Sequence, residues 1–222
     1  MRRLFSGVIV GILALVPVAS YGQSGKTIPK SPVVRKDQSP VYDVETVARL
    51  FDIGYSKEEL AAFGKPPDPL SGFVTFFDPG MSILRVRAAI RERGGIFAAQ
   101  DWYHKYQSFA ELEEKPRYRQ LRMDAMYHSR VQALSEQKKL LAMGEEIPHA
   151  RVVVTGMVVH FLITREPLYP TYWVRCRDRD ADGNSIGVGR FRSGGFWIDG
   201  GWSDGPHGGL GLCPLRSPNP RK

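Results

Sequence analysis

Cysteine and histidine are scarce in this chain, and their scarcity excludes several classes of metalloprotein. The 222 residues contain two cysteines and five histidines. No CxxC pair occurs, and no two histidines lie one helical turn apart, so the sequence has neither a zinc ligand set nor an iron–sulfur motif. We therefore expect a domain that folds around an apolar core and needs no cofactor.

Long apolar runs are also lacking, and the run that exists lies at the N-terminus. Arg2 and Arg3 precede an apolar stretch over residues 4–19, which is followed by small residues up to Gly22. This stretch is shorter than the roughly 20 residues that span a bilayer. We expect residues 1–22 to be a cleaved signal peptide and the protein to be secreted or to face the periplasm or cell envelope. An uncleaved anchor is the alternative.

Acidic residues are outnumbered by basic ones. The chain has 31 Lys and Arg against 23 Asp and Glu, and loss of Arg2 and Arg3 with the signal lowers the formal net charge from +8 to +6. A basic protein outside the cytoplasm attracts anionic envelope polymers and lipid head groups. The same charge also serves plain solubility.

Both cysteines, Cys176 and Cys213, lie in the mature part of the chain. In an oxidising compartment two such residues can form a disulfide, which would stabilise the fold by about 3 to 4 kcal/mol. Two buried thiols are the alternative.

The pattern along the chain predicts one α+β domain over residues 42–213, with several helices followed by a small antiparallel C-terminal sheet. A disordered linker over residues 23–41 precedes it, and a flexible basic tail over residues 214–222 follows it.

Capping and breaking residues place the elements within this domain. Helices are expected over residues 44–52, 56–64, 82–93, from residue 108 to a break at Pro116, and over 117–143. Residues 73–77 read as a strand. Residues 152–163 fit a strand or a buried helix, and their length favours the helix. Asp182-Gly183 predicts a tight hairpin.

Three motifs suggest chemistry, and each has a plainer explanation. Asp178, Asp180 and Asp182 resemble the first half of a calcium loop, but the bidentate Glu of the second half is missing. The charged tip of a hairpin would have the same sequence pattern. Asp101 and His104 could form an acid/base pair. Residues 201–205 match G-x-S-x-G without the strand–turn–helix context that a nucleophile elbow needs.

An arginine-rich face follows from the hairpin. A two-residue turn at Asp182-Gly183 would place Arg175 opposite Arg190 and Trp173 opposite Arg192. Facing like charges are destabilising unless an anion lies between them. We therefore expect an anion on this face, supplied either by the protein's own carboxylates or by a ligand. Its expected members are Trp173, Arg175, Arg177, Arg190 and Arg192.

Several longer segments, taken in their order along the chain, resemble those of a known protein family. They are FDIGYSKEELAAFGKPPDPLSGF, FFDPG, QDWYHK, PRYRQLRM, ARVVVTGMVVHFL, YWVRCRDRDADG, VGRF and GLGL. Through them the chain is similar, over residues 46–212, to a family of uncharacterised proteins from candidate-phyla bacteria. The resemblance implies one domain of conserved length and a helix over residues 150–163. It implies no activity, cofactor or catalytic residue, and the chain departs from the family at Cys213-Pro214.

These patterns predict a non-enzymatic binding or structural module with an anionic partner, without a transmembrane span in its mature form. One alternative is a metal-assisted or acid/base hydrolase. Another is a helix-turn-helix DNA-binding protein built on residues 44–63, if residues 1–22 are not a signal. Glu58 and Glu59 on its second helix disfavour sequence-specific binding to nucleic acid.

Overall fold

The structure, a computed structural model, describes the central part of the chain. The described residues are 39–91, 96–98, 100, 102–104 and 108–217. The predicted signal peptide, nearly all of the predicted linker, Asp101 and residues 218–222 lie outside them.

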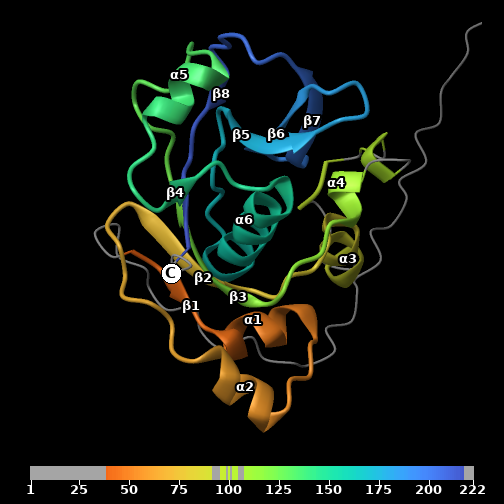
Figure 1. The fold of residues 1–222 in the computed structure, drawn as a ribbon. Helices are drawn as coiled ribbons and strands as arrows, with labels where there is room; N and C mark the ends of the chain where they lie inside the picture. Colours follow the sequence, from red (N-terminus) through yellow and green to blue (C-terminus); the bar gives the residue numbers. More distant parts are fainter. Residues whose placement is uncertain (1–38, 92–95, 99, 101, 105–107, 218–222) are drawn as a thin grey trace, which may run out of the picture. The chain divides into compact units, whose positions relative to one another are not determined.

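A five-stranded mixed sheet forms one layer of the domain, with the strand order β1-β2-β3-β9-β4 (Figure 1). Its strands are β1 (Val41–Tyr42), β2 (Phe73–Asp78), β3 (Arg117–Arg122), β9 (Leu215–Arg216) and β4 (Glu145–Glu146). β1 is parallel to β2, whereas the other neighbours are antiparallel. Every residue of β2 is buried, as expected for a strand covered on both faces.

A second sheet follows in the C-terminal part, with the order β7-β6-β5-β8. It contains β5 (Trp173–Arg179), β6 (Ser185–Arg192), β7 (Gly195–Trp202) and β8 (Leu210–Gly211). The predicted α+β class and the antiparallel meander β5-β6-β7 are confirmed. β8 runs parallel to β5, so the sheet is only partly antiparallel.

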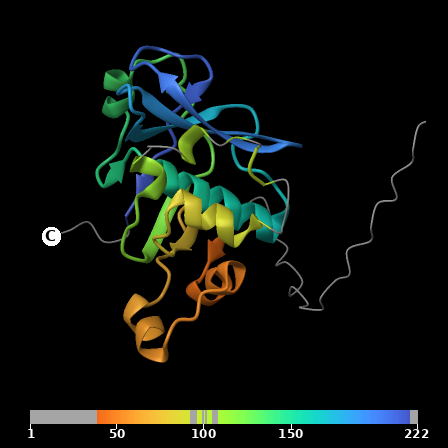
Figure 2. The ribbon, with the colours of Figure 1, turned by 90° about the vertical axis from the view of Figure 1, so that its right-hand side faces the viewer.

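Helix α6 (Ala150–Thr164) lies between the two sheets (Figures 1 and 2). It is apolar on nearly all sides, as is typical of a helix buried in a core. Gly156 lets it approach the first sheet closely, because a Cβ there would lie 3.1 Å from side-chain atoms of Leu121 and Phe76. The prediction of a helix rather than a strand at residues 152–163 is confirmed.

Shorter helices surround these layers. They are α1 (Val44–Phe51), α2 (Lys57–Phe63), α3 (Ile83–Ala89), α4 (Ser108–Glu111), α5 (Leu134–Lys139) and the 3₁₀ turn η2 (Trp102–His104). Asp43 caps α1, and the predicted capping box of Ser56 and Glu59 opens α2. Among the helices in the described ranges, none has both the length and the apolarity needed to span a membrane.

The predicted long helix over residues 117–143 is wrong. Residues 117–122 form β3, and only Leu134–Lys139 is helical. Charged and amide side chains in this segment suggested a solvated helix, but Arg119 and Gln120 are buried with polar partners inside the fold. Tertiary contacts therefore override the local helix signal.

The predicted boundaries of the linker and the tail also need correction. Leu215 and Arg216, assigned to the tail, form β9 between β3 and β4. At the other end the Pro40 carbonyl accepts a hydrogen bond of 2.8 Å from the Thr75 amide, so the fold begins before residue 42.

The hairpin between β5 and β6 forms with a different register from the predicted one. Arg175 pairs with Gly187, not with Arg190. The turn is longer than two residues because the Asp180 carboxylate accepts hydrogen bonds from the amides of Asp182 and Asn184, at 3.0 and 2.8 Å. The predicted facing pairs of like charges are therefore wrong.

Cys176 and Cys213 are free thiols, so the predicted disulfide is wrong. Both are buried, and burial raises the pKa of each thiol. They pack as small apolar side chains of the core, and Cys213 Sγ contacts the Tyr172 hydroxyl at 3.9 Å.

Acidification is expected to destabilise the domain through His160 on α6. Its Nδ1 lies 2.9 Å from the Tyr42 hydroxyl, and burial lowers its pKa to about 4 although Glu166 acts in the opposite direction. The unfolded chain takes up this proton near its ordinary pKa of about 6.5. Stability is thus complete above that pH and falls by about 3 kcal/mol as the pH approaches 4. Urea unfolding at stepped pH measures the loss.

His160→Gln is the matched control for this titration, because glutamine keeps a polar group and carries no titrating proton. Its stability should change less between pH 6.5 and 4. A dependence of stability on pH equal to that of the unmodified protein would contradict the role given to His160.

Glu114 contributes to the loss of stability at lower pH. Its pKa is lowered to about 2, so its share of stability is lost only below about pH 4.5.

Candidate functional site

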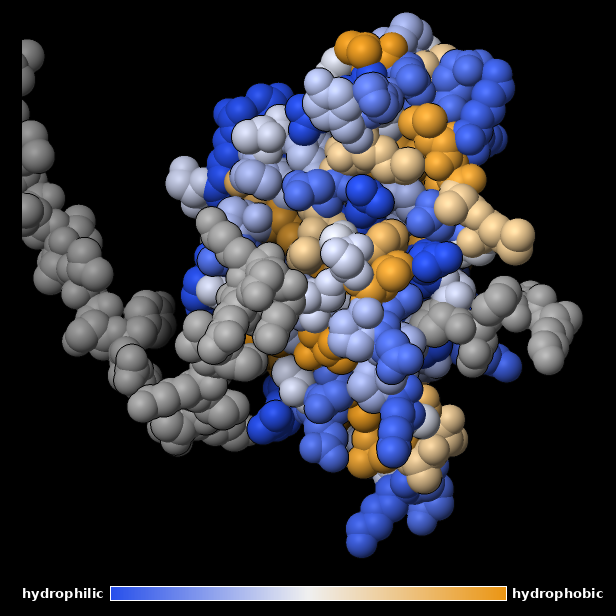
Figure 3. Space-filling view, turned by 90° about the vertical axis from the view of Figure 1, so that its left-hand side faces the viewer, coloured by the Kyte–Doolittle hydropathy of each residue, from blue (hydrophilic) through white to orange (hydrophobic). Residues whose placement is uncertain are grey.

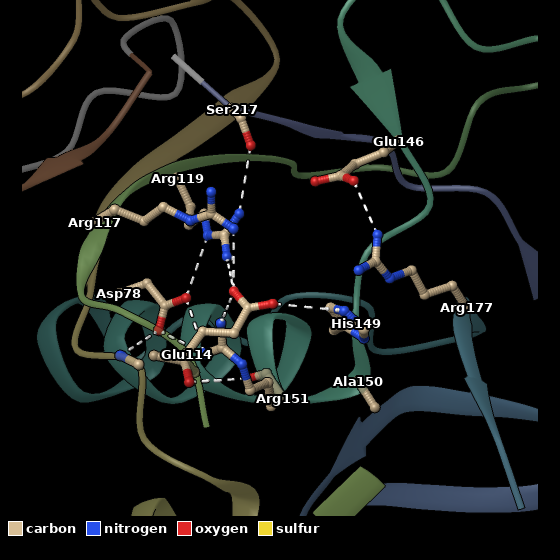
Figure 4. A network of polar contacts seen from close by, with 12 residues as sticks. Asp78, Glu114, Arg117, Arg119, Glu146, His149, Ala150, Arg151, Arg177 and Ser217 are labelled. Carbon is tan, nitrogen blue, oxygen red and sulfur yellow. Dashed lines mark hydrogen bonds and ion pairs between the residues drawn. The ribbon is translucent and has the colours of Figure 1, made fainter. Parts of the chain in front are cut away.

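A buried ion network joins the first sheet to α6 (Figure 4). Asp78 ends β2, Arg119 lies on β3 and Arg151 lies in the first turn of α6; all three side chains are at most 1 % exposed. Arg151 Nη1 donates to both Asp78 oxygens at 3.0 Å, and Arg119 Nε donates to Asp78 Oδ2 at 3.3 Å. Buried charges need such partners, because an unpaired ion in the interior is strongly destabilising.

Glu114, on the loop before β3, extends the network toward the surface. Its Oε2 accepts hydrogen bonds from three guanidinium groups, those of Arg117, Arg119 and Arg151. Burial alone would raise the pKa of Glu114, but attraction to Arg151 and Arg119 outweighs burial and lowers the pKa to about 2. Glu114 is therefore a carboxylate at any physiological pH.

The turn at Gly80 fixes the loop that carries Glu114. The Glu114 amide donates to the Gly80 carbonyl at 2.9 Å, and the Gly80 amide donates to Asp78 Oδ1 at 2.9 Å. Gly80 has a φ of +75°, and a Cβ at this position would lie only 1.9 Å from the Glu114 carbonyl oxygen. Only glycine allows this approach.

His149 and Asp178 form a second polar pair beside Glu114. Asp178 Oδ1 lies 2.7 Å from His149 Nδ1, and its Oδ2 accepts the Ala150 amide at the start of α6. His149 Nε2 lies 3.6 Å from Glu114 Oε1. Asp178 thus orients the histidine and caps the helix, where the positive end of the helix dipole favours a carboxylate.

Three guanidinium groups converge on the two carboxylates at the centre of the network. The guanidinium groups of Arg117, Arg119 and Arg151 face the carboxylates of Asp78 and Glu114, three against two. The Asp178 carboxylate, which contacts His149 and accepts the Ala150 amide, adds a third negative charge beside them. Arg117 is the outermost guanidinium, with 42 % of its side chain exposed. Arg117 is therefore the guanidinium of this network that a ligand at the surface can reach.

A pocket of about 390 Å³ lies at this outer edge. It is lined by Ala62, Phe63, Lys65, Pro67, Pro116, Arg117, Tyr118 and Ser217. Arg117 donates from Nη2 to Glu114 at 3.1 Å and has other N–H groups left over, since a guanidinium carries five donors. Ser217 Oγ accepts from Arg119 Nη1 at 3.4 Å, which leaves its own proton to donate. Lys65 is exposed, and within the described ranges it forms no ion pair.

The five residues of the predicted arginine face do not form the predicted facing pairs. Arg175 is fully buried and donates to the carbonyls of Ser203 and Gly205, both at 3.1 Å. Arg177 pairs with Glu146 at 3.0 Å. Trp173 is buried beside Trp202. Of the remaining two, Arg190 lies within the register shift between Gly189 and Arg192, and Arg192 pairs with Gly195 of β7. Because Arg175 does not face Arg190, no anion is required between them.

The predicted metal and acid/base residues are placed differently as well. Asp178 binds His149, Asp180 binds backbone amides of its own turn, and no group of three or more His, Cys, Asp or Glu within the described ranges could hold a metal ion. Asp101 lies outside the described residues, and His104 Nε2 contacts Arg87 Nη1 at 2.7 Å.

The G-x-S-x-G segment brings Ser203 Oγ within 3.2 Å of His207 Nε2. Ser203 follows β7 and leads into a turn rather than a helix, and no carboxylate in the described ranges holds the histidine. The segment therefore lacks the third group and the elbow of a serine hydrolase.

A larger pocket of about 560 Å³ is lined by Leu84, Arg87, Ala88, Ile90, Arg91, Ile96, Phe97 and His104. Its Arg87 guanidinium already contacts the Gln100 carbonyl, the Tyr103 hydroxyl and His104. Figure 3 shows polar residues interspersed with smaller apolar groups on one face. Tyr127, Val131 and Met143 are exposed, but scattered apolar side chains are ordinary on protein surfaces.

The sequence did not single out Asp78, Glu114, Arg117, Arg119 or Arg151. One signal was present, since Arg151 is the only fully charged residue in an otherwise apolar segment of fifteen residues, α6. A lone arginine there requires a buried anionic partner. Comparison of the chain with protein-family models, with curated proteins and with solved structures finds no match.

Proposed function

We propose that this chain is a secreted or envelope-facing binding module that holds an anionic group, a phosphate or a carboxylate, in the pocket at Arg117. The observation that carries the proposal is the convergence of Arg117, Arg119 and Arg151 on one carboxylate, next to a pocket with further donors.

Arg117, Lys65 and Ser217 supply the donors for such a ligand. A guanidinium can hold phosphate or carboxylate through two parallel N–H donors, and a charge-assisted hydrogen bond is about twice as strong as a neutral one. Glu114 and Arg119 fix Arg117 and Ser217 in place before the ligand arrives, which lowers the entropic cost of binding.

The proposed location rests on the N-terminal pattern of Arg2, Arg3 and the apolar run. Likewise, kinship with proteins of candidate-phyla bacteria remains a proposal based on the segments quoted above. Neither is needed for the pocket to bind an anion.

A second candidate is an acid/base hydrolase, favoured by one observation, the pairing of Asp178 with His149. A carboxylate that orients a histidine is a recurrent device of general-base catalysis. Recovery of the bound ligand unchanged after long incubation would favour the binding module.

Arg117→Ala is expected to weaken the binding of inorganic phosphate about tenfold or more, because it removes the guanidinium donor at the pocket. Isothermal titration calorimetry at low ionic strength measures this, and added salt should weaken binding to the unmodified protein. The matched control is Arg85→Ala, because Arg85 is a surface arginine with 63 % of its side chain exposed and pairs with Glu113. Equal phosphate affinity in all three proteins would overturn the proposal.

A further inference from the structure

The pocket at Arg117 has apolar walls as well as cationic donors. Arg117 begins the inner strand β3 and Ser217 follows the inner strand β9, whereas Ala62, Phe63 and Pro67 come from the end of α2 and the loop after it. A bare inorganic anion would use only the donors Arg117, Ser217 and Lys65. Ala62, Phe63 and Pro67 provide an apolar surface against which a larger ligand can pack.

The ring of Phe63 is held by other aromatic side chains. It packs against Tyr55 with ring centroids 5.0 Å apart and an interplanar angle of 77°, and against Phe77 at 4.8 Å. Tyr118, which also lines the pocket, packs against Phe77 at 5.4 Å. Phe63 is only half-buried, so part of a fixed aromatic ring remains accessible. A fixed ring loses little entropy when another ring packs against it.

The size of the pocket limits what can enter. A volume of about 390 Å³ lies within the range of small-molecule sites and is suited to one ring with an acidic substituent.

We infer that the ligand of this pocket is a small aromatic anion, a phosphate or carboxylate attached to a planar ring. The anionic group lies against Arg117, Lys65 and Ser217, and the ring covers Phe63 and Pro67. Offset or edge-to-face contact with Phe63 and the flat faces of the two prolines favour a ring over a flexible alkyl chain. This inference rests on the proposed function, since it names the class of ligand for the same site.

Calorimetry with three probes tests the inference: inorganic phosphate, phenyl phosphate and butyl phosphate. Phenyl phosphate should bind about tenfold more tightly than inorganic phosphate and more tightly than butyl phosphate. Phe63→Leu keeps an apolar side chain of similar volume but removes the ring. It should lose most of the preference for phenyl phosphate and retain the affinity for inorganic phosphate, which also shows that the variant is folded.

The outcomes separate the two proposals. Equal affinities for inorganic and phenyl phosphate, or a butyl phosphate affinity equal to that of phenyl phosphate, overturn the aromatic ligand and leave the anion site standing. A preference for phenyl phosphate that persists in Phe63→Leu overturns the role of the Phe63 ring. Binding of none of the three probes overturns the proposed function together with the inference.

Discussion

Arg151→Met is expected to lower the free energy of unfolding by about 3 to 5 kcal/mol, because it removes the main partner of a fully buried carboxylate. Asp78 accepts two hydrogen bonds of 3.0 Å from Arg151 and would keep only the longer one from Arg119, apart from the Gly80 amide. Methionine fits the apolar surroundings of α6, so the loss reports the charge rather than the volume. Urea unfolding at neutral pH measures it.

Arg85→Met provides the control for this variant, because it removes the same functional group from an exposed ion pair. Its expected cost is about 1 kcal/mol or less, as is typical of surface pairs. A cost for Arg151→Met as small as that for Arg85→Met would show that the network is not a buried electrostatic unit.

Gly80→Ala is expected to destabilise the domain by about 3 kcal/mol or more, through overpacking added to left-handed backbone strain. The new Cβ would lie 1.9 Å from the Glu114 carbonyl oxygen, so the Asp78-Pro79-Gly80 turn or the Glu114 loop must move. Because that loop carries Glu114 and leads into Arg117, the same variant should also weaken binding of phosphate. Urea unfolding and calorimetry measure the two effects.

Gly72→Ala separates the steric contact from the backbone strain. Gly72 has a φ of +79°, close to that of Gly80, but a Cβ there would meet nothing within 4 Å. It is expected to cost only the left-handed strain, about 1 to 2 kcal/mol. If the two variants are equally stable, the close approach of Gly80 to the Glu114 loop does not constrain the fold.

Local sequence signals were sufficient to predict the helix starts and the C-terminal strands. Asp43 and the pair Ser56 and Glu59 predict the starts of α1 and α2, because capping is set by residues three positions apart. The alternation after Tyr172 predicts the C-terminal meander. The class of fold follows from these elements.

The short strands and the turn at Asp180 could not be predicted from the sequence, because they depend on contacts that local sequence patterns do not encode. Four strands, β1, β4, β8 and β9, are only two residues long and therefore too short to show any periodicity. They form because each pairs with a neighbouring strand. The wide turn at Asp180 depends on side-chain hydrogen bonds that the Asp-Gly pair does not encode, and it moves Arg175 away from Arg190.

The candidate site could not be predicted from the sequence either, because it also depends on non-local contacts. Asp78, Glu114, Arg119 and Arg151 come from four separate segments, and each of the first three, taken alone, resembles an ordinary surface charge. Only the packing of β2, β3 and α6 brings them together. The isolated Arg151 of the apolar helix was the one local sign that a buried anion had to exist.

An amide NMR titration of the ¹⁵N-labelled chain with inorganic phosphate tests the central claim most directly, because it locates the anion on the protein. The account predicts that the largest shifts fall on Phe63, Lys65, Arg117, Tyr118 and Ser217, which all line the pocket. Shifts concentrated instead around Arg175, Arg190 and Arg192 on β5 and β6, or spread evenly over the basic surface, would contradict it.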